Sequence, residues 1–172
     1  MREAWALVFS VAAVAAALAQ DAPNGTRFAP RGARFDVWFP AEPTLRDTSD
    51  GDNTIHVATG PQRKTADDLY LTCHWVLNDE LREEKNVPAY LFGVVQGAVQ
   101  SSKGKLLENK EIALNGFPGR QYVIEVNDRN TLATRVYFAD DRVIYVGVMG
   151  KNHDAVIGPE ARQFWDSLRI GK

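Results

Sequence analysis

Short runs of apolar residues, many of them alternating with polar residues, dominate this chain and predict mainly β-strands. The run 35–39 is rich in strand-forming side chains and ends at Pro40. The run 143–149 is uncharged and mostly apolar, which is typical of a central strand covered on both faces. Further strands are predicted around Leu45 and at 55–58, 69–77, 105–114, 120–126 and 131–139.

Two segments instead have the spacing of amphipathic helices. The first runs from Val87 to Ser102, where Asn86 is suited to cap the helix and Pro88 to occupy its first turn. It is expected to stop at Gly104, and its apolar stripe consists of Leu91, Phe92, Val95, Ala98 and Val99. A second helix begins at Pro159 and turns an apolar side toward the sheet through Ala161, Phe164, Trp165 and Leu168.

Seven or eight strands, joined mostly by short turns and accompanied by a helix on each side, predict an α+β fold. The expected architecture is an antiparallel β-sheet with helices on both faces, an α/β/α sandwich. Turns are expected at 115–119 and at Asp140 and Asp141. The stretch from Asp47 to Asn53 is interpreted as a solvated polar turn, because it lacks the residue order and the bidentate glutamate of a calcium loop.

Residues 1–19 have the pattern of a signal peptide. Arg2 precedes an apolar run over 4–18, and small residues stand at the two positions that signal peptidase recognises in Ala17-Leu18-Ala19. The apolar run is shorter than the roughly 20 residues of a membrane-spanning helix. An uncleaved membrane anchor is the alternative interpretation of this segment.

Cleavage after Ala19 would leave a periplasmic or secreted chain that begins at Gln20. Residues 20–33 contain two prolines and two glycines without an apolar period, which indicates a flexible lead-in. Residues 34–172 fit a single domain, because about 100–200 residues is the usual size of one domain.

The composition excludes several classes of protein. Apolar residues make up 45% of the 172-residue chain, as in ordinary globular proteins, which excludes a disordered or fibrous chain. The 20 Lys and Arg against 22 Asp and Glu give a net charge of −2, so the chain lacks the basic surplus that nucleic-acid binding requires. A single cysteine, Cys73, excludes an internal disulfide.

Four motifs stand out along the chain: the opening strand at 35–40, the sequence Gly104-Lys105-Leu106-Leu107 after the helix, IALNGFPGR at 112–120 and the closing FWDSLR at 164–169. Together they resemble the motifs of the PsbP-like domain. The resemblance covers about residues 33–171, and the chain is similar in particular to secreted bacterial relatives of unknown role.

This resemblance implies the fold shared by the extrinsic PsbP subunit of photosystem II and the Ran-GTPase release factor. It also implies a protein that docks on partners rather than an enzyme. The chain has no motif specific to photosystem binding or to Ran binding, so neither partner is expected. Motifs of this kind describe turns and core aromatics, and they therefore indicate fold more than function.

Cys73 and His74 are the residues most suggestive of catalysis, because a thiolate nucleophile needs a nearby base. Consecutive residues of a strand point to opposite faces, so the thiol and the imidazole are expected to diverge. Cys73 is expected in the core with Leu71, Trp75 and Leu77, where burial raises the pKa of the thiol and makes it inert. A thiol-dependent enzyme or redox protein that uses Cys73 and His74 is the alternative function.

His56, His74 and His153 are widely separated and lack the spacing of metal ligands, so no metal site is expected. Nucleotide-binding glycine motifs and the serine-hydrolase elbow are absent from the sequence. The sequence therefore predicts no catalytic, cofactor-binding or metal-binding residues and no enzyme activity. The expected function is that of an exported binding module of PsbP-like fold for a protein partner or small ligand, with membrane contact only if residues 1–19 stay uncleaved.

Overall fold

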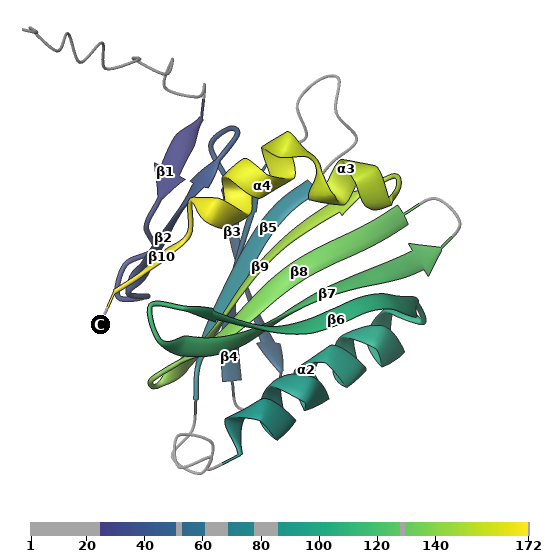
Figure 1. The fold of residues 1–172 in the computed structure, drawn as a ribbon. Coiled ribbons are helices and arrows are strands. Elements are labelled where there is room, and N and C mark those ends of the chain that lie inside the picture. Colours follow the sequence, from purple (N-terminus) through teal and green to yellow (C-terminus); the bar gives the residue numbers. More distant parts are fainter. Residues whose placement is uncertain (1–24, 51–52, 61–68, 78–85, 128–129, 172) are drawn as a thin grey trace, which may run out of the picture.

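The computed structural model describes residues 25–50, 53–60, 69–77, 86–127 and 130–171 (Figure 1). The strands in these ranges are β1 (Thr26–Phe28), β2 (Phe35–Phe39), β3 (Thr44–Asp50), β4 (Asn53–Gly60), β5 (Leu69–Val76), β6 (Lys105–Leu114), β7 (Phe117–Asn127), β8 (Asn130–Ala139), β9 (Arg142–Gly150) and β10 (Arg169–Ile170). The helices are α2 (Val87–Ser102), α3 (His153–Ile157) and α4 (Pro159–Asp166).

Seven of these strands form one antiparallel sheet in the order β3-β4-β5-β9-β8-β7-β6. Strands β6 to β9 are successive hairpins, whereas β5 pairs with β9 across an intervening segment that contains α2 and β6 to β8. A second sheet has the order β1-β2-β10. The predicted antiparallel sheet is confirmed, and the small second sheet is a feature that the sequence did not predict.

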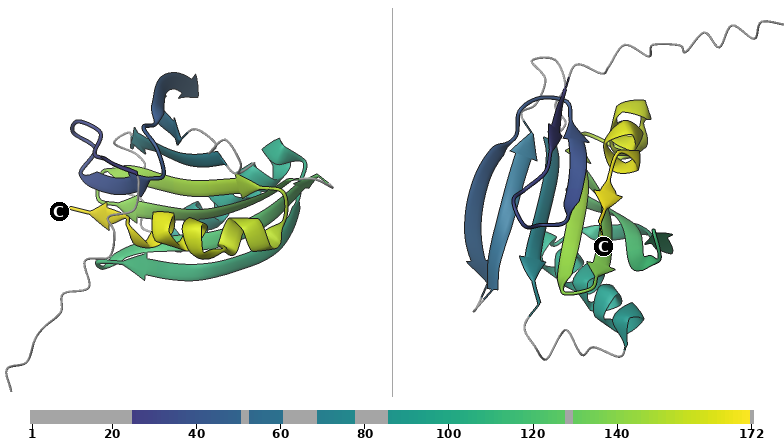
Figure 2. Two further views of the ribbon diagram at one scale, coloured as in Figure 1. Left: turned by 90° about the horizontal axis from the view of Figure 1, so that it is seen from above. Right: turned by 90° about the vertical axis from the view of Figure 1, so that its left-hand side faces the viewer.

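Two clusters of buried side chains use alternate residues of the same strands. In β7, Tyr122 and Ile124 belong to the cluster that includes Leu91 of α2, whereas Val123 belongs to the cluster that includes Phe164 of α4. Successive residues of a strand point to opposite faces, which accounts for the separation of the two sets. Helices α2 and α4 therefore pack against different residues of the sheet, and Figure 2 shows the two helices well apart.

Helix α2 begins and ends as the local sequence signals predict. The side-chain Oδ1 of Asn86 accepts a hydrogen bond from the backbone N–H of Ala89 at 3.2 Å, which satisfies one of the free donors of the first turn. At the other end Lys103 adopts a left-handed conformation with φ of 51°, directly before the predicted stop at Gly104. The predicted helix over 87–102 is confirmed.

The chain before β2 differs from the expectation. The sequence predicts a flexible lead-in over 20–33, but Thr26–Phe28 forms β1 and pairs with β2. Phe28 packs edge-on against Phe39 of β2, with ring centroids 5.8 Å apart. Three residues are too few to show a strand period in the sequence. These three residues form a strand because their backbone pairs with that of β2, and because Phe28 packs against the ring of Phe39.

The polar turn predicted from Asp47 to Asn53 is wrong over most of its length. Asp47 lies inside β3 and pairs with His56 of β4, and the strand continues to Asp50. Strand β3 stands at one end of the sheet order, with a partner on one side among the described strands. Charged residues suit such an edge strand, so polarity alone does not distinguish it from a turn.

Helix α3, with five residues, is too short to show a helical period, and the sequence did not predict it. None of the helices in the described ranges has the length and apolar composition that crossing a membrane requires. The predicted signal peptide at 1–19 lies outside the described residues.

Candidate functional site

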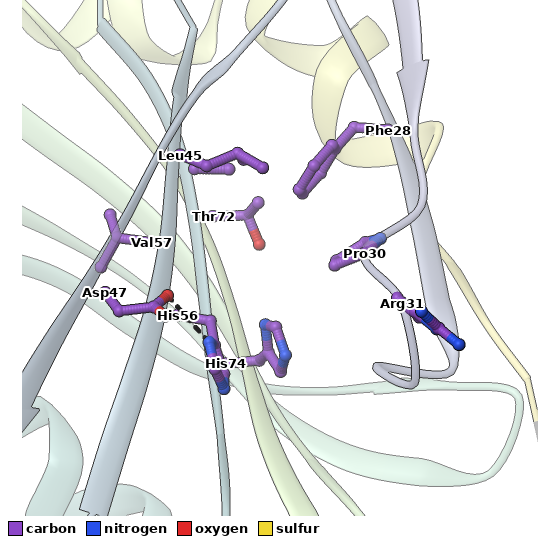
Figure 3. Close-up of a pocket in the computed structure, with 10 residues that line it drawn as sticks. Phe28, Pro30, Arg31, Leu45, Asp47, His56, Val57, Thr72 and His74 are labelled. Atoms are coloured by element: carbon purple, nitrogen blue, oxygen red, sulfur yellow. Dashed lines mark hydrogen bonds and ion pairs between the residues drawn. The ribbon is translucent and has the colours of Figure 1, made fainter.

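A pocket of about 180 Å³ opens at the β3 end of the large sheet, beside the chain that links β1 to β2 (Figure 3). Strands β3, β4 and β5 form its floor. The end of β1 and the segment between β1 and β2 form its cover. We call it the histidine pocket, and it is lined by Phe28, Pro30, Arg31, Leu45, Asp47, His56, Val57, Ala58, Thr72 and His74.

The floor consists of two rows of side chains that run across the three strands in register. The first row, from β3 to β5, is Leu45, Ala58 and Thr72. The second row, two residues along each strand, is Asp47, His56 and His74. Residues two apart in a strand point to the same face, so both rows face the pocket.

The cover comes from the end of β1 and the turn that follows it, through Phe28, Pro30 and Arg31. This turn is fixed to the large sheet, because Nη1 of Arg142 in β9 donates a hydrogen bond to the carbonyl oxygen of Gly32 at 2.6 Å. Gly32 has a φ of 76°, a left-handed conformation that a residue without a Cβ adopts at little cost. The cover is therefore held in place over the floor by both sheets.

The two histidines of the floor stack on each other. Their ring centroids are 4.9 Å apart and the ring planes differ by 27°. Nδ1 of His56 lies 2.9 Å from Oδ1 of Asp47, a hydrogen bond that becomes an ion pair when the imidazole is protonated. This contact orients the ring of His56, whose outer side stays open to solvent.

His74 is the deeper member of this stack. It is 7% exposed, and the edge of its ring meets Phe35 at a centroid distance of 5.4 Å. Burial lowers the pKa of His74 to about 4, and the nearby charges of His56 and Arg142 act in the same direction. At neutral pH the imidazole is therefore uncharged, with one N–H donor and one acceptor nitrogen. Among the described residues His74 has ring contacts but makes no hydrogen bond.

Thr72 adds a second polar group to the floor. Its hydroxyl donates a hydrogen bond to the carbonyl oxygen of Tyr145 in β9 at 2.8 Å. The proton of the hydroxyl is therefore occupied, and the oxygen keeps its two lone pairs as acceptors. The other lining residues of the first row, Leu45 and Ala58, are apolar, so the pocket combines apolar walls with a few polar groups.

The sequence did not predict this site. It assigned His74 a role only beside Cys73, in the alternative of a thiol-dependent enzyme or redox protein, and it assigned His56 none. His56 and His74 come together because β4 and β5 pair antiparallel in the register that places these two residues opposite each other. The third histidine does not join them. Its Nε2 lies 2.7 Å from Oε1 of Glu108, in a separate contact that involves β6. In the described part of the chain, no group of three or more His, Cys, Asp or Glu residues is placed to hold a metal ion.

Cys73 lies on the opposite face of β5 from His74, as the alternation of the strand predicts. The prediction that its face is the core face is only partly right. Leu71, Cys73 and Trp75 are half-buried, whereas Tyr70, Thr72 and His74 are buried. Burial around the sulfur nevertheless raises the pKa of the Cys73 thiol to about 12.

The raised pKa predicts that the thiol of Cys73 reacts slowly with alkylating reagents. At pH 8 we expect Cys73 to react with iodoacetamide about a thousandfold more slowly in the folded protein than in urea, because the raised pKa leaves little thiolate. Mass spectrometry of timed samples measures both rates. Comparable rates in the folded and unfolded protein would show that the thiol is reactive and would favour the alternative of a thiol-dependent enzyme.

Comparisons with known proteins place the fold but give no family by sequence. Neither the family models nor the curated proteins contain a match to this chain. Among solved structures, the chain is similar to cyanobacterial PsbP (CyanoP) from Synechocystis sp. PCC 6803, with a TM-score of 0.59 and 11% sequence identity. That similarity covers 85% of this chain and 92% of the cyanobacterial one.

A second similar structure is a protein from Bacteroides thetaiotaomicron, with a TM-score of 0.46 and 12% identity. The match covers 87% of this chain and 49% of that protein, so this chain corresponds to about half of its length. The likeness to CyanoP extends over nearly the whole of both chains at low identity, which makes it a likeness of fold. The chain therefore has the PsbP-like fold that the motifs in its sequence resemble.

Proposed function

We propose that this chain is an exported, non-catalytic binding module, an α/β/α sandwich of PsbP-like fold whose ligand site is the histidine pocket. The observation that carries the proposal is the pocket itself. Ligand sites are typically concave and mostly apolar, with a few polar groups that orient the ligand. Here Leu45 and Ala58 provide apolar floor, Phe28 provides a ring above it, and His74 provides a polar group at the bottom.

The chemistry of the pocket favours binding over catalysis. Nucleophilic catalysis needs a hydroxyl or thiol that a base can deprotonate. The hydroxyl of Thr72 already donates to a backbone carbonyl, and the thiol of Cys73 points to the other face of the sheet.

Export is the part of the proposal that rests on the sequence. The apolar run over 4–18, in a segment that ends in Ala17-Leu18-Ala19, is typical of a cleaved signal peptide. A mature chain that begins at Gln20 is the product that this proposal expects. Such a chain keeps every residue of the histidine pocket, so export and binding are compatible.

A fragment screen tests the proposed function. We expect fragments of one or two rings, added to the isotope-labelled protein, to shift backbone amide NMR signals of the pocket residues in β3, β4 and β5. The variant Phe28→Ala removes the ring of the cover and should weaken binding by about tenfold, since burying one aromatic contact contributes about 1–2 kcal/mol. The amide shifts and their titration curves give the site and the dissociation constants together.

Phe92→Ala is the matched control, because Phe92 is an exposed phenylalanine of α2 that contacts Arg120 and does not line the histidine pocket. This variant should bind the same fragments as the wild type. A screen in which no fragment shifts the pocket amides, or in which the shifts gather around Phe92 and Arg120, would contradict the proposed site.

A further inference from the structure

We infer that the histidine pocket binds a phenol, meaning a single aromatic ring that carries a hydroxyl group. This inference rests on the proposed binding function and specifies its ligand. It combines the volume of the pocket, the ring and apolar side chains that line it, and the imidazole of His74 at its floor, which makes no hydrogen bond within the described part of the chain.

The volume of the pocket fits one ring. An apolar cavity of roughly 150 Å³ holds a benzene molecule, and the histidine pocket has a volume of about 180 Å³. A benzene ring with one or two small substituents fits this space. Drug-sized ligands need pockets of about 300 Å³ or more, so a larger ligand could place only one of its rings here.

The walls fit the faces and edges of an aromatic ring. Phe28 enters the pocket from the cover, on the side opposite Leu45 (Figure 3). Ala58, which pairs with Leu45 across β3 and β4, adds to the apolar part of the floor. Aromatic rings pack well edge-on against other rings, as Phe28 already does against Phe39. A flat, apolar ligand such as an aromatic ring therefore fits the walls of this pocket best.

The polar group at the floor selects the substituent. His74 is more than nine-tenths buried, lines the pocket, and makes no hydrogen bond among the described residues. Its ring nitrogens are not among the enclosed side-chain atoms that lack a partner, so they are open to the pocket, where a ligand that forms a hydrogen bond with them displaces solvent. A neutral imidazole presents either an N–H or a lone pair. A hydroxyl group can bind either one, because it can donate a hydrogen bond to the lone pair or accept one from the N–H.

The charges around His74 disfavour a charged ligand group. Arg31 lines the cover and the guanidinium of Arg142 acts on His74 from β9, so an ammonium group would meet two positive charges. A carboxylate would lose its hydration at the floor, where Arg142 is already bound to Asp141 and to the carbonyl of Gly32. An uncharged hydroxyl avoids both penalties, because it loses little hydration on entering the pocket.

A phenol ring has two natural sources, a free small molecule and the side chain of a tyrosine in a peptide. The chemistry that His74 and Phe28 recognise is the same for both. The probes p-cresol and N-acetyl-tyrosine amide separate them, because the second carries the peptide groups that must stay outside the pocket. Binding of p-cresol alone indicates a free molecule, and binding of both indicates that a tyrosine side chain also fits.

The test compares p-cresol with p-xylene, in which a methyl group replaces the hydroxyl at nearly the same size. We expect p-cresol to bind the wild-type protein about tenfold more tightly than p-xylene in NMR titrations, since the net gain of one well-placed hydrogen bond has about this effect. In the variant His74→Phe, which keeps a ring and loses both nitrogens, the two probes should bind within about twofold of each other.

His153→Phe is the matched control, because His153 lies outside the histidine pocket and should leave the preference for p-cresol unchanged. If His74→Phe does not fold, the comparison of the two probes on the wild-type protein still decides the inference. Equal dissociation constants for p-cresol and p-xylene at the pocket would overturn the phenol assignment and leave the binding function standing. Absence of pocket binding by any ring compound would overturn the proposed function itself.

Discussion

Replacing Phe164 with alanine is expected to lower the free energy of unfolding by about 3–5 kcal/mol, the usual cost of removing a buried phenylalanine ring. Phe164 of α4 is 0% exposed. Its ring meets Phe39 of β2 at a centroid distance of 5.1 Å and Tyr70 of β5 at 5.3 Å, both edge-on. The variant leaves a cavity where the small sheet, the large sheet and α4 meet. Urea unfolding followed by tryptophan fluorescence measures the loss.

Phe92→Ala serves as the control for this variant, because Phe92 is a phenylalanine that is 45% exposed on α2. Its loss should cost less than about 1 kcal/mol, even with its contact to the guanidinium of Arg120. Similar losses for the two variants would mean that Phe164 is not part of a packed core. Phe39 also contacts Phe28, so the Phe164→Ala cavity should loosen the cover of the histidine pocket as well.

Elements that depend on neighbouring residues could be predicted from the sequence. Helix α2 was predicted to the residue because its cap at Asn86 and its apolar stripe are local signals. The hairpins from β6 to β7 and from β8 to β9 were predicted from local turn signals, although the turn expected over 115–119 is limited to Asn115 and Gly116, because β7 already begins at Phe117. Asn115 and Gly116 both have positive φ, at 53° and 88°, as a two-residue hairpin turn requires. Asp140, with φ of 54°, has a similar place in the turn between β8 and β9.

The histidine pocket could not be predicted in this way, because each of its parts depends on a pairing between distant residues. His56 and His74 meet only if β4 and β5 pair in one register, and a shift of one residue would turn one ring to the other face. The alternation of residues in β5 did not show that the face with His74 is the buried one, because both faces of the strand carry apolar residues. The cover consists of the end of β1, a three-residue strand without a detectable period in the sequence, and of the turn that follows it.

The stability of the protein is expected to fall as the pH falls from about 6.5 toward 4, and His74 is expected to account for about 1–2 kcal/mol of the fall. In the unfolded chain a histidine has a pKa near 6.5, whereas in the folded protein burial lowers the pKa of His74 to about 4. Between these values the unfolded chain binds more protons, so each drop in pH favours unfolding. The full shift would give a larger effect, which we reduce because the pocket admits solvent to one side of the ring.

The comparison of variants isolates this contribution from that of the other titrating groups. His74→Gln keeps a polar side chain but cannot take up a proton, so its free energy of unfolding should change less than that of the wild type between pH 7 and pH 4.5. His153→Gln should keep the wild-type contribution of His74, since His153 pairs with Glu108 outside the pocket. Urea titrations at each pH give the three curves. If His74→Gln and the wild type lose stability in parallel, the imidazole of His74 takes up its proton as easily in the folded protein as in the unfolded chain. The neutral floor group on which the preference for an uncharged hydroxyl depends would then be absent below neutral pH.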